Sequence, residues 1–282
     1  MAMTALLCLV RFLLLVSICA SLATYFLFWY ENAWSARFAP DGGTKPRLMV
    51  LSGLLSSIVS LTFIVVSYPF GLFRRFWEPK EISASEPVII LTHGLYHNAS
   101  AWLLFRSILR KAGFKNVFVM NYGSFFTSFE KTLKKFERFV ADARNVVPNQ
   151  PVYLIGHSLG GLLSRVYAER ARDEAIPAAV ITIGSPHQGS KVAAFSLGKL
   201  AKSLLYRGPL FTELECGTPR LPCSGIALFS PVDNIVLPSE AMKAPYPGWV
   251  YYETGPLSHT AMIYSKSVAK KVVEILQGKE IA

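Results

Sequence analysis

The residues Gly156-His157-Ser158-Leu159-Gly160 have the types and the spacing that a nucleophilic serine requires. They lie between the apolar run 152–155 and a segment with helical periodicity, which predicts a strand, a tight turn and a helix. Glycines on both sides of Ser158 permit the strained backbone of such a turn and close packing of its neighbours. The turn places Ser158 at a helix N-terminus, where free N–H groups favour a developing negative charge. The pentapeptide alone leaves open that this is an ordinary glycine-rich turn.

A serine hydroxyl is a weak nucleophile at neutral pH and needs a base to take its proton. We predict that this base is His259, which follows the last apolar strand and immediately precedes the final helical pattern. That position lies at the edge of the sheet from which a side chain can reach Ser158. The alternative for His259 is a surface loop histidine. The other four histidines adjoin the serine or lie in loops after earlier strands: His93, His97, His157 and His187.

The segments that must position these side chains alternate in character from Pro87 onward. Short apolar runs alternate with amphipathic runs, which predicts a parallel sheet flanked by helices. The expected strands are 88–91, 117–120, 152–155, 179–183, 226–229 and 249–252, and the expected helices are 99–112, 129–147, 159–172 and 262–276. Residues 188–224 break the pattern, and a connection of this length is often a cover over an active site. We therefore expect an α/β domain over 81–282 with a lid or insert at 188–224.

Two uncharged apolar stretches, Phe12 to Tyr30 and Leu48 to Phe73, precede this domain. Each is long enough to cross a hydrocarbon core of about 30 Å. We predict transmembrane helices over these two ranges and a membrane anchor over residues 1–80. The first stretch has an alternative as a cleaved signal peptide, because Arg11 precedes it and Ser21-Leu22-Ala23 resembles a cleavage site.

Basic residues near the ends of the two stretches predict the orientation of the chain. Arg11, Arg74, Arg75 and Lys80 lie on one side, and Arg37, Lys45 and Arg47 lie in the loop between the stretches. This small excess favours an integral membrane protein with both termini, and with them the large domain, in the cytoplasm. Cys216 and Cys223 favour the opposite location, because a short disulfide could form between them in an oxidising compartment.

The net charge of +11 bears on which partners the domain binds. For a tethered domain, attraction to an anionic lipid surface explains an excess of lysine and arginine. A solvated basic face with no partner is the alternative. Nucleic acid is not an expected partner, because the sequence holds no nucleic-acid-binding motif. The sequence does not determine the oligomeric state.

Four segments resemble the matching segments of bacterial triacylglycerol lipases and related esterases. They are Leu91-Thr92-His93-Gly94-Leu95, Gly156-His157-Ser158-Leu159-Gly160-Gly161, Ile183-Gly184-Ser185-Pro186-His187-Gln188-Gly189-Ser190 and Ser230-Pro231-Val232-Asp233-Asn234-Ile235-Val236. The resemblance covers Pro87 to Gly278 and implies an α/β-hydrolase fold that hydrolyses carboxylic esters through an acyl-serine, without a cofactor. We expect no metal either, because no cluster of carboxylates suggests a calcium site. The two apolar stretches depart from those secreted lipases, so bilayer lipids or membrane-delivered esters become the expected substrates.

The order of catalytic residues in α/β hydrolases places a carboxylate between the serine and the histidine. Asp233 is the candidate that directly follows a predicted buried strand, and its role would be to orient the His259 imidazole. A turn-forming aspartate after Pro231 is the alternative. Backbone N–H groups of Leu159 and Leu95 are the expected donors to the tetrahedral oxyanion.

The main hypothesis is therefore a membrane-anchored serine hydrolase, a lipase or esterase, with the triad Ser158, Asp233 and His259. A second hypothesis keeps the acyl-enzyme and passes the acyl group to an alcohol, amine or thiol, or acts on a thioester. A third is a catalytically silent, membrane-bound interaction module with this fold.

Overall fold

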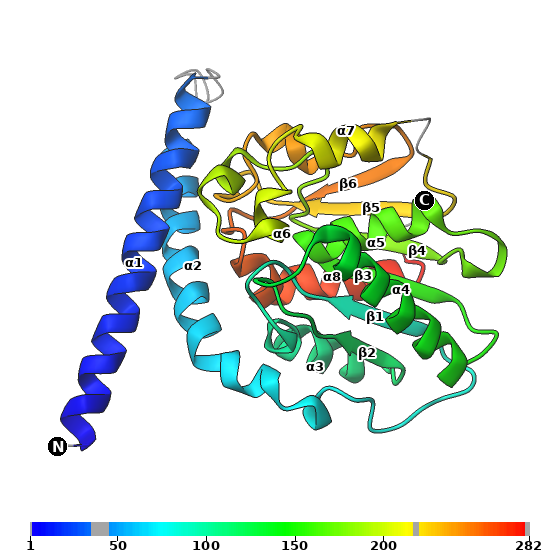
Figure 1. Ribbon diagram of the computed structural model, residues 1–282. Helices are drawn as coiled ribbons and strands as arrows, with labels where there is room; N and C mark the ends of the chain where they lie inside the picture. Colours follow the sequence, from blue (N-terminus) through cyan, green and yellow to red (C-terminus); the bar gives the residue numbers. More distant parts are fainter. Residues whose placement is uncertain (1, 35–44, 217–219, 280–282) are drawn as a thin grey trace.

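The centre of the molecule is a parallel sheet. A computed structural model describes residues 2–34, 45–216 and 220–279. Six strands lie in the order β2-β1-β3-β4-β5-β6 (Figure 1). They are β1 (Val88–Thr92), β2 (Val117–Met120), β3 (Val152–His157), β4 (Ala179–Ile183), β5 (Ser224–Phe229) and β6 (Trp249–Glu253). All neighbours pair in parallel, so the predicted fold class is confirmed.

Helices cover both faces of the sheet and bury it. One face packs against α4 (Phe129–Val146) and α5 (Leu159–Arg170), and the other packs against α3 (Leu103–Lys111) and α8 (Lys266–Leu276). Alternate residues of β1 enter the two clusters, Ile90 on the α5 side and Ile89 on the α8 side. Burial on both faces explains why the strands are continuous apolar runs in the sequence.

Two expected helices differ from the prediction at their N-terminal ends. The range 99–112 begins as the 3₁₀ helix η4 (Ala99–Trp102) before α3. The range 262–276 is divided into the 3₁₀ helix η8 (Ala261–Tyr264) and α8, because the Ser265 side chain accepts the Val268 N–H and starts a new helix there. Hydrophobic periodicity does not distinguish a short 3₁₀ turn from the α-helix that follows it.

Two long apolar helices precede the domain, as predicted. They are α1 (Ala2–Trp34) and α2 (Lys45–Ser67), and α2 continues into the 3₁₀ helices η2 (Tyr68–Leu72) and η3 (Arg74–Phe76). The stretches Leu7–Ala33 and Arg47–Leu72 are long and apolar enough to cross a membrane by length and composition. Arg37, which contributes to the predicted orientation, lies in 35–44, outside the described residues.

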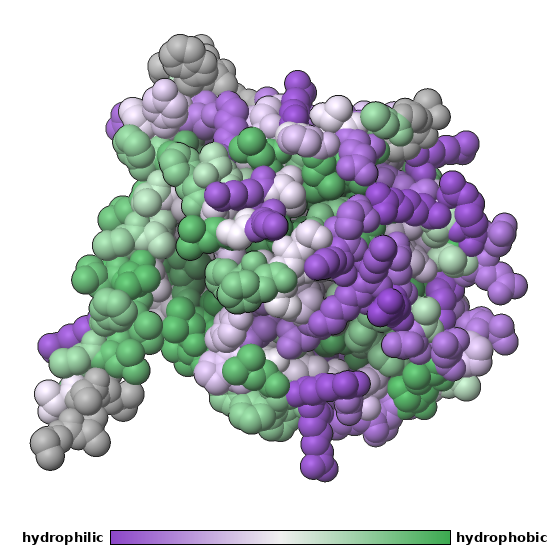
Figure 2. Space-filling view, in the orientation of Figure 1, coloured by the Kyte–Doolittle hydropathy of each residue, from purple (hydrophilic) through white to green (hydrophobic). Residues whose placement is uncertain are grey.

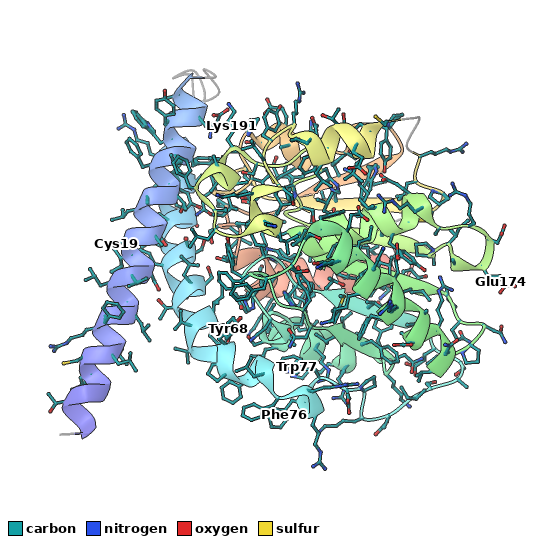
Figure 3. All side chains as sticks on the ribbon, viewed as in Figure 1. Cys19, Tyr68, Phe76, Trp77, Glu174 and Lys191 are labelled. Carbon is teal, nitrogen blue, oxygen red and sulfur yellow. The ribbon has the colours of Figure 1, made fainter. Side chains whose placement is uncertain are left out.

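The pair of α1 and α2, here called the helical hairpin, lies along one side of the α/β domain, and α2 separates the lower part of α1 from the domain (Figure 1). Figure 2 shows that the hairpin surface is hydrophobic, whereas much of the domain surface is hydrophilic. Figure 3 marks Lys191 of the domain beside the upper end of α1, where its Nζ lies 2.8 Å from Glu31 Oε1. The hairpin and the domain therefore share an extended contact.

The segment 188–224 contains the 3₁₀ helix η6 (Lys191–Phe195), α6 (Lys199–Lys202) and α7 (Pro209–Glu215). The side chains of Leu204 and Phe211 are buried in the core, whereas Phe195 and Leu197 are 74% and 70% exposed. The role of the segment 188–224 as a lid stays a prediction. Cys216 and Cys223 are free cysteines in the structure.

Candidate active site

Ser158 lies on a strained turn between β3 and α5. Its backbone has φ 53° and ψ −124°, a conformation that residues with a side chain rarely adopt. The Ser158 N–H donates to Ile183 O of the neighbouring strand at 2.9 Å, which holds the turn against the sheet. Strain of this kind is concentrated at functional sites.

Glycines next to this turn are needed because the backbone segments touch. A Cβ at Gly160 would lie 2.1 Å from Thr92 O, and a Cβ at Gly156 would lie 2.2 Å from Gly161 N. Such distances exclude any side chain at either position. The spacing of the glycines around Ser158 predicted this close packing.

Asp233 and His259 form a buried hydrogen-bonded pair. The Nδ1 atom of His259 lies 2.7 Å from Asp233 Oδ2, and the two side chains are almost fully buried. The other carboxylate oxygen, Oδ1, accepts the N–H groups of Ile235 and Val236, both at 2.9 Å. A carboxylate is an acceptor, so Nδ1 carries the proton and Nε2 of the neutral imidazole is left to accept one.

Two contacts and one close approach place the Ser158 turn and the Asp233–His259 pair at the same edge of the sheet. The Nε2 atom of His157 lies 3.0 Å from His259 O, and the two imidazole rings are 4.7 Å apart. The close approach is at Gly184, which follows Ile183: a Cβ added there would lie 3.2 Å from Asp233 Oδ2.

Among the described residues, no hydrogen bond joins the Ser158 hydroxyl to His259. Catalytic hydrogen bonds are often long before substrate binds and shorten in the complex.

The loop after β1 lies against Ser158 and supplies the second expected oxyanion donor. A Cβ at Gly94 would lie 2.9 Å from Ser158 Cβ and 2.9 Å from His157 Nδ1, so only glycine fits there. The N–H groups of Leu95 and Leu159 have no hydrogen-bond partner within the part of the chain that the structure describes. Both therefore remain candidate donors to an oxyanion.

His93 is engaged within the protein and fixes this loop. Its Nε2 accepts the Tyr122 N–H at 3.2 Å, and its Nδ1 donates to Gly94 O at 2.8 Å. Burial lowers the pKa of His93 to about 4, so the ring is neutral near pH 7. The ring stacks on Tyr122 with 4.2 Å between ring centroids. His93 thus holds the Leu95 loop to the sheet.

The remaining histidines also have partners. His97 Nε2 lies 2.7 Å from the Tyr264 hydroxyl, and burial lowers the pKa of His97 to about 3. His187 Nε2 lies 3.1 Å from Thr182 Oγ1, and burial lowers its pKa well below the ordinary value. Among the described residues, neither imidazole hydrogen-bonds to a carboxylate, whereas that of His259 does.

Two residues that hold His259 were not predicted from the sequence. His157 contacts the His259 carbonyl, and burial lowers the pKa of His157 well below its usual value, so it is a neutral donor. Asn234 Oδ1 accepts the His259 N–H at 3.1 Å. Their positions next to Ser158 and Asp233 in the sequence were the only available signal.

A cavity of about 380 Å³ adjoins the Leu95 loop. Its lining includes Tyr68 from η2, Tyr96, Tyr122 and the aromatic pair Phe125 and Phe126; Figure 3 marks Tyr68 at the lower end of α2. The cavity is lined from the end of the hairpin and from the loop after β1, and nothing in the sequence predicted it. Among the described residues, no group of three or more histidine, cysteine, aspartate or glutamate side chains could hold a metal ion.

Comparison with known proteins agrees with this architecture. Residues 87–203 match a family model described as the alpha/beta hydrolase fold. A triacylglycerol lipase of Burkholderia plantarii is 37% identical over 172 residues, which are 58% of this chain and 41% of that protein. The chain has the α/β-hydrolase fold.

Within that class it resembles bacterial triacylglycerol lipases and esterases. The mature lipase BlEst2 of Bacillus licheniformis superposes with a TM-score of 0.60 at 17% identity, over 71% of this chain and 95% of that one. Lipase B of Aspergillus fumigatus superposes with a TM-score of 0.58 at 15% identity, over 71% of this chain and 55% of that one. At such identities the two structures show the fold alone.

Proposed function

We propose that this protein is a serine hydrolase that cleaves carboxylic esters through an acyl-serine intermediate, as a lipase or esterase. The observation that carries the proposal is the buried Asp233–His259 hydrogen bond at the sheet edge where Ser158 lies on a strained turn. Similarity to a triacylglycerol lipase supports the substrate class. The N–H groups of Leu95 and Leu159 are the oxyanion donors.

In the first half of the reaction, Ser158 Oγ attacks the ester carbonyl carbon while its proton passes to His259 Nε2. The carbonyl oxygen becomes an oxyanion that accepts from Leu95 and Leu159, and Asp233 stabilises the imidazolium. The bond between the carbonyl carbon and the leaving oxygen then breaks, and the imidazolium protonates the departing alcohol. In the second half, His259 takes a proton from water, the hydroxide attacks the acyl-serine, and the fatty acid leaves as Ser158 regains its proton.

The hairpin supports a membrane location. Large apolar side chains on its outer surface are exposed, for example Phe26 at 62% and Val59 at 69%. Lipid is the medium in which such a surface is stable. Contacts of Tyr25 with the domain favour a retained α1 over a cleaved signal peptide. We propose an anchor over 1–80, packed along one side of a catalytic domain over 81–282, with a lid at 188–224.

The cavity beside Leu95 is suited to part of the substrate. Its aromatic lining includes the fully exposed Phe126, the half-exposed Phe125, and Tyr96, which follows Leu95 in the chain. A substrate delivered from the bilayer would pass the end of α2 at Tyr68. Membrane acyl lipids are therefore the proposed substrates.

The test is hydrolysis of an ester series of rising acyl length by the full chain, in detergent and in phospholipid vesicles. Wild type should release free fatty acid. The increase in its hydrolysis rate from detergent to vesicles should be larger for esters with longer acyl chains. Ser158→Ala should lose several orders of magnitude in kcat, whereas Ser107→Ala, an exposed serine on α3, should keep wild-type activity. Equal activity of Ser158→Ala and wild type would refute the proposal. Acyl transfer to an added alcohol at the expense of fatty acid would favour the transferase alternative.

A further inference from the structure

One face of α2 carries hydroxyls that bond the loop holding His259. Ser52, Ser56 and Ser60 are four residues apart, so they lie on one side of the helix. Their partners follow one another in the loop: Ser52 Oγ donates to Pro256 O at 3.1 Å, the Ser258 N–H donates to Ser56 Oγ at 2.8 Å, and the Ser60 and Thr260 hydroxyls are 2.6 Å apart. His259 lies between the last two attachment points.

The other helix of the hairpin bonds the loop that holds Asp233. The Tyr25 hydroxyl donates to Val232 O at 2.9 Å. The Asn234 Nδ2 amide donates to Thr24 Oγ1 at 2.7 Å, and Asn234 Oδ1 accepts the His259 N–H. Thr24 is therefore connected to the backbone of His259 through a single side chain.

The contact is closely packed as well as hydrogen-bonded. Tyr25, Phe28, Val232 and Leu237 form a buried apolar cluster between α1 and the Asp233 loop. A Cβ at Gly53 of α2 would lie 2.2 Å from the Tyr25 hydroxyl oxygen and 2.9 Å from Val232 Cγ2. The two helices and the loop thus meet without space for an added methyl group, and the loop has little freedom to shift.

Two hydroxyls of the hairpin, those of Thr24 and Ser56, accept hydrogen bonds from the loops. Thr24 Oγ1 donates to Ala20 O at 2.9 Å, and Ser56 Oγ donates to Gly53 O at 2.8 Å, so each proton is used within its own helix. A lone pair of each oxygen remains for the loop donor. Without these oxygens, the donors on Asn234 and Ser258, both buried, would lose their partners.

We propose that the helical hairpin is a positioning element of the active site, in which Thr24 and Ser56 hold His259 in place through Asn234 and Ser258. The inference rests on the proposed function, because it takes His259 as the base. A general base must be aligned closely with its nucleophile, and a displacement of about 1 Å can lower the rate about 100-fold. The apolar helices then serve catalysis directly, in addition to any contact with lipid.

The test compares Thr24→Val and Ser56→Ala with Thr62→Val, all in the full chain in detergent micelles. Among its described contacts, the Thr62 hydroxyl bonds its own helix at Ile58 O, so Thr62→Val is the matched control. The substrate is a short, soluble ester, and active sites are counted with a fluorophosphonate so that misfolded protein does not enter kcat. Thr24→Val and Ser56→Ala should lower kcat about 10-fold to 100-fold with KM unchanged, and Thr24→Ser, which keeps the hydroxyl, should restore it.

The inference fails if kcat of Thr24→Val and Ser56→Ala equals that of Thr62→Val, or if Thr24→Ser remains as impaired as Thr24→Val. A loss seen only as fewer active sites, with normal kcat at each, would also overturn it, because that result means a structural role alone. Ser158→Ala separates the two proposals. If it retains activity, the proposed function fails, whereas an inactive Ser158→Ala beside fully active Thr24→Val and Ser56→Ala refutes the positioning role alone.

Discussion

Replacement of Asp233 with asparagine should remove most activity without unfolding the protein, and the structure explains why. The Oδ1 atom accepts two backbone N–H groups, from Ile235 and Val236. In Asp233→Asn the amide oxygen must take that position, because an NH₂ group there would face two donors. The amide nitrogen is then directed at His259 Nδ1, where Oδ2 lies at 2.7 Å in the native protein.

This arrangement forces the wrong tautomer of His259. The amide is a donor, so Nδ1 must give up its proton and accept, and the proton moves to Nε2. An Nε2 that carries a proton cannot take one from Ser158. The expected loss is about 10⁴ in kcat, which corresponds to about 5 kcal/mol of activation free energy at about 1.4 kcal/mol per tenfold.

The assay is steady-state hydrolysis of a short ester near neutral pH, with thermal unfolding of the same samples. Asp233→Asn should unfold within a few degrees of wild type, because both acceptor bonds of Oδ1 are retained. Activity within about tenfold of wild type, with the fold intact, would refute the assignment of Asp233 as the residue that orients the base.

Three further predictions follow from the same contacts. Gly184→Ala should lower the free energy of unfolding by about 1–3 kcal/mol, because φ is +56° and its Cβ would lie 2.5 Å from Met262 Cε; an unchanged urea midpoint contradicts this. Stability should decrease as pH falls from 6.5 to about 4, because burial lowers the pKa of His93 to about 4 and the unfolded chain takes up the proton first. His93 alone contributes up to about 1.4 kcal/mol per pH unit, and equal urea midpoints at pH 7 and pH 5 would contradict this. The double variant Phe195→Ser, Leu197→Ser should raise KM for long-chain esters alone. Its unfolding midpoint should be unchanged, because both side chains are exposed. An equal rise in KM for short esters would argue against a lid.

The sequence predicted the sheet and the positions of its strands well, because strands buried on both faces are continuous apolar runs. The strands Val117–Met120 and Ala179–Ile183 match the predicted ranges at both ends. Pairing of Asp233 with His259 followed from their positions after the last two strands. Parallel strands bring such loops to one edge of the sheet.

Long-range contacts of single polar groups were not predictable. Ser52, Ser56 and Ser60 are ordinary small residues of an apolar helix by sequence, and their partners lie 200 or more residues away in the chain. No local pattern records such a pairing, because it arises only when the hairpin packs on the domain. The cavity beside Leu95 is equally a product of loops from different strands and the end of α2.

The central claim, that Ser158 is a nucleophile activated by His259, is tested most directly by covalent labelling with a fluorophosphonate and mass analysis of the labelled peptide. We predict a single adduct on Ser158, absent from Ser158→Ala and formed far more slowly in His259→Gln. An unlabelled wild-type protein would instead favour the silent interaction module, and an adduct on another residue would contradict the assignment of the site.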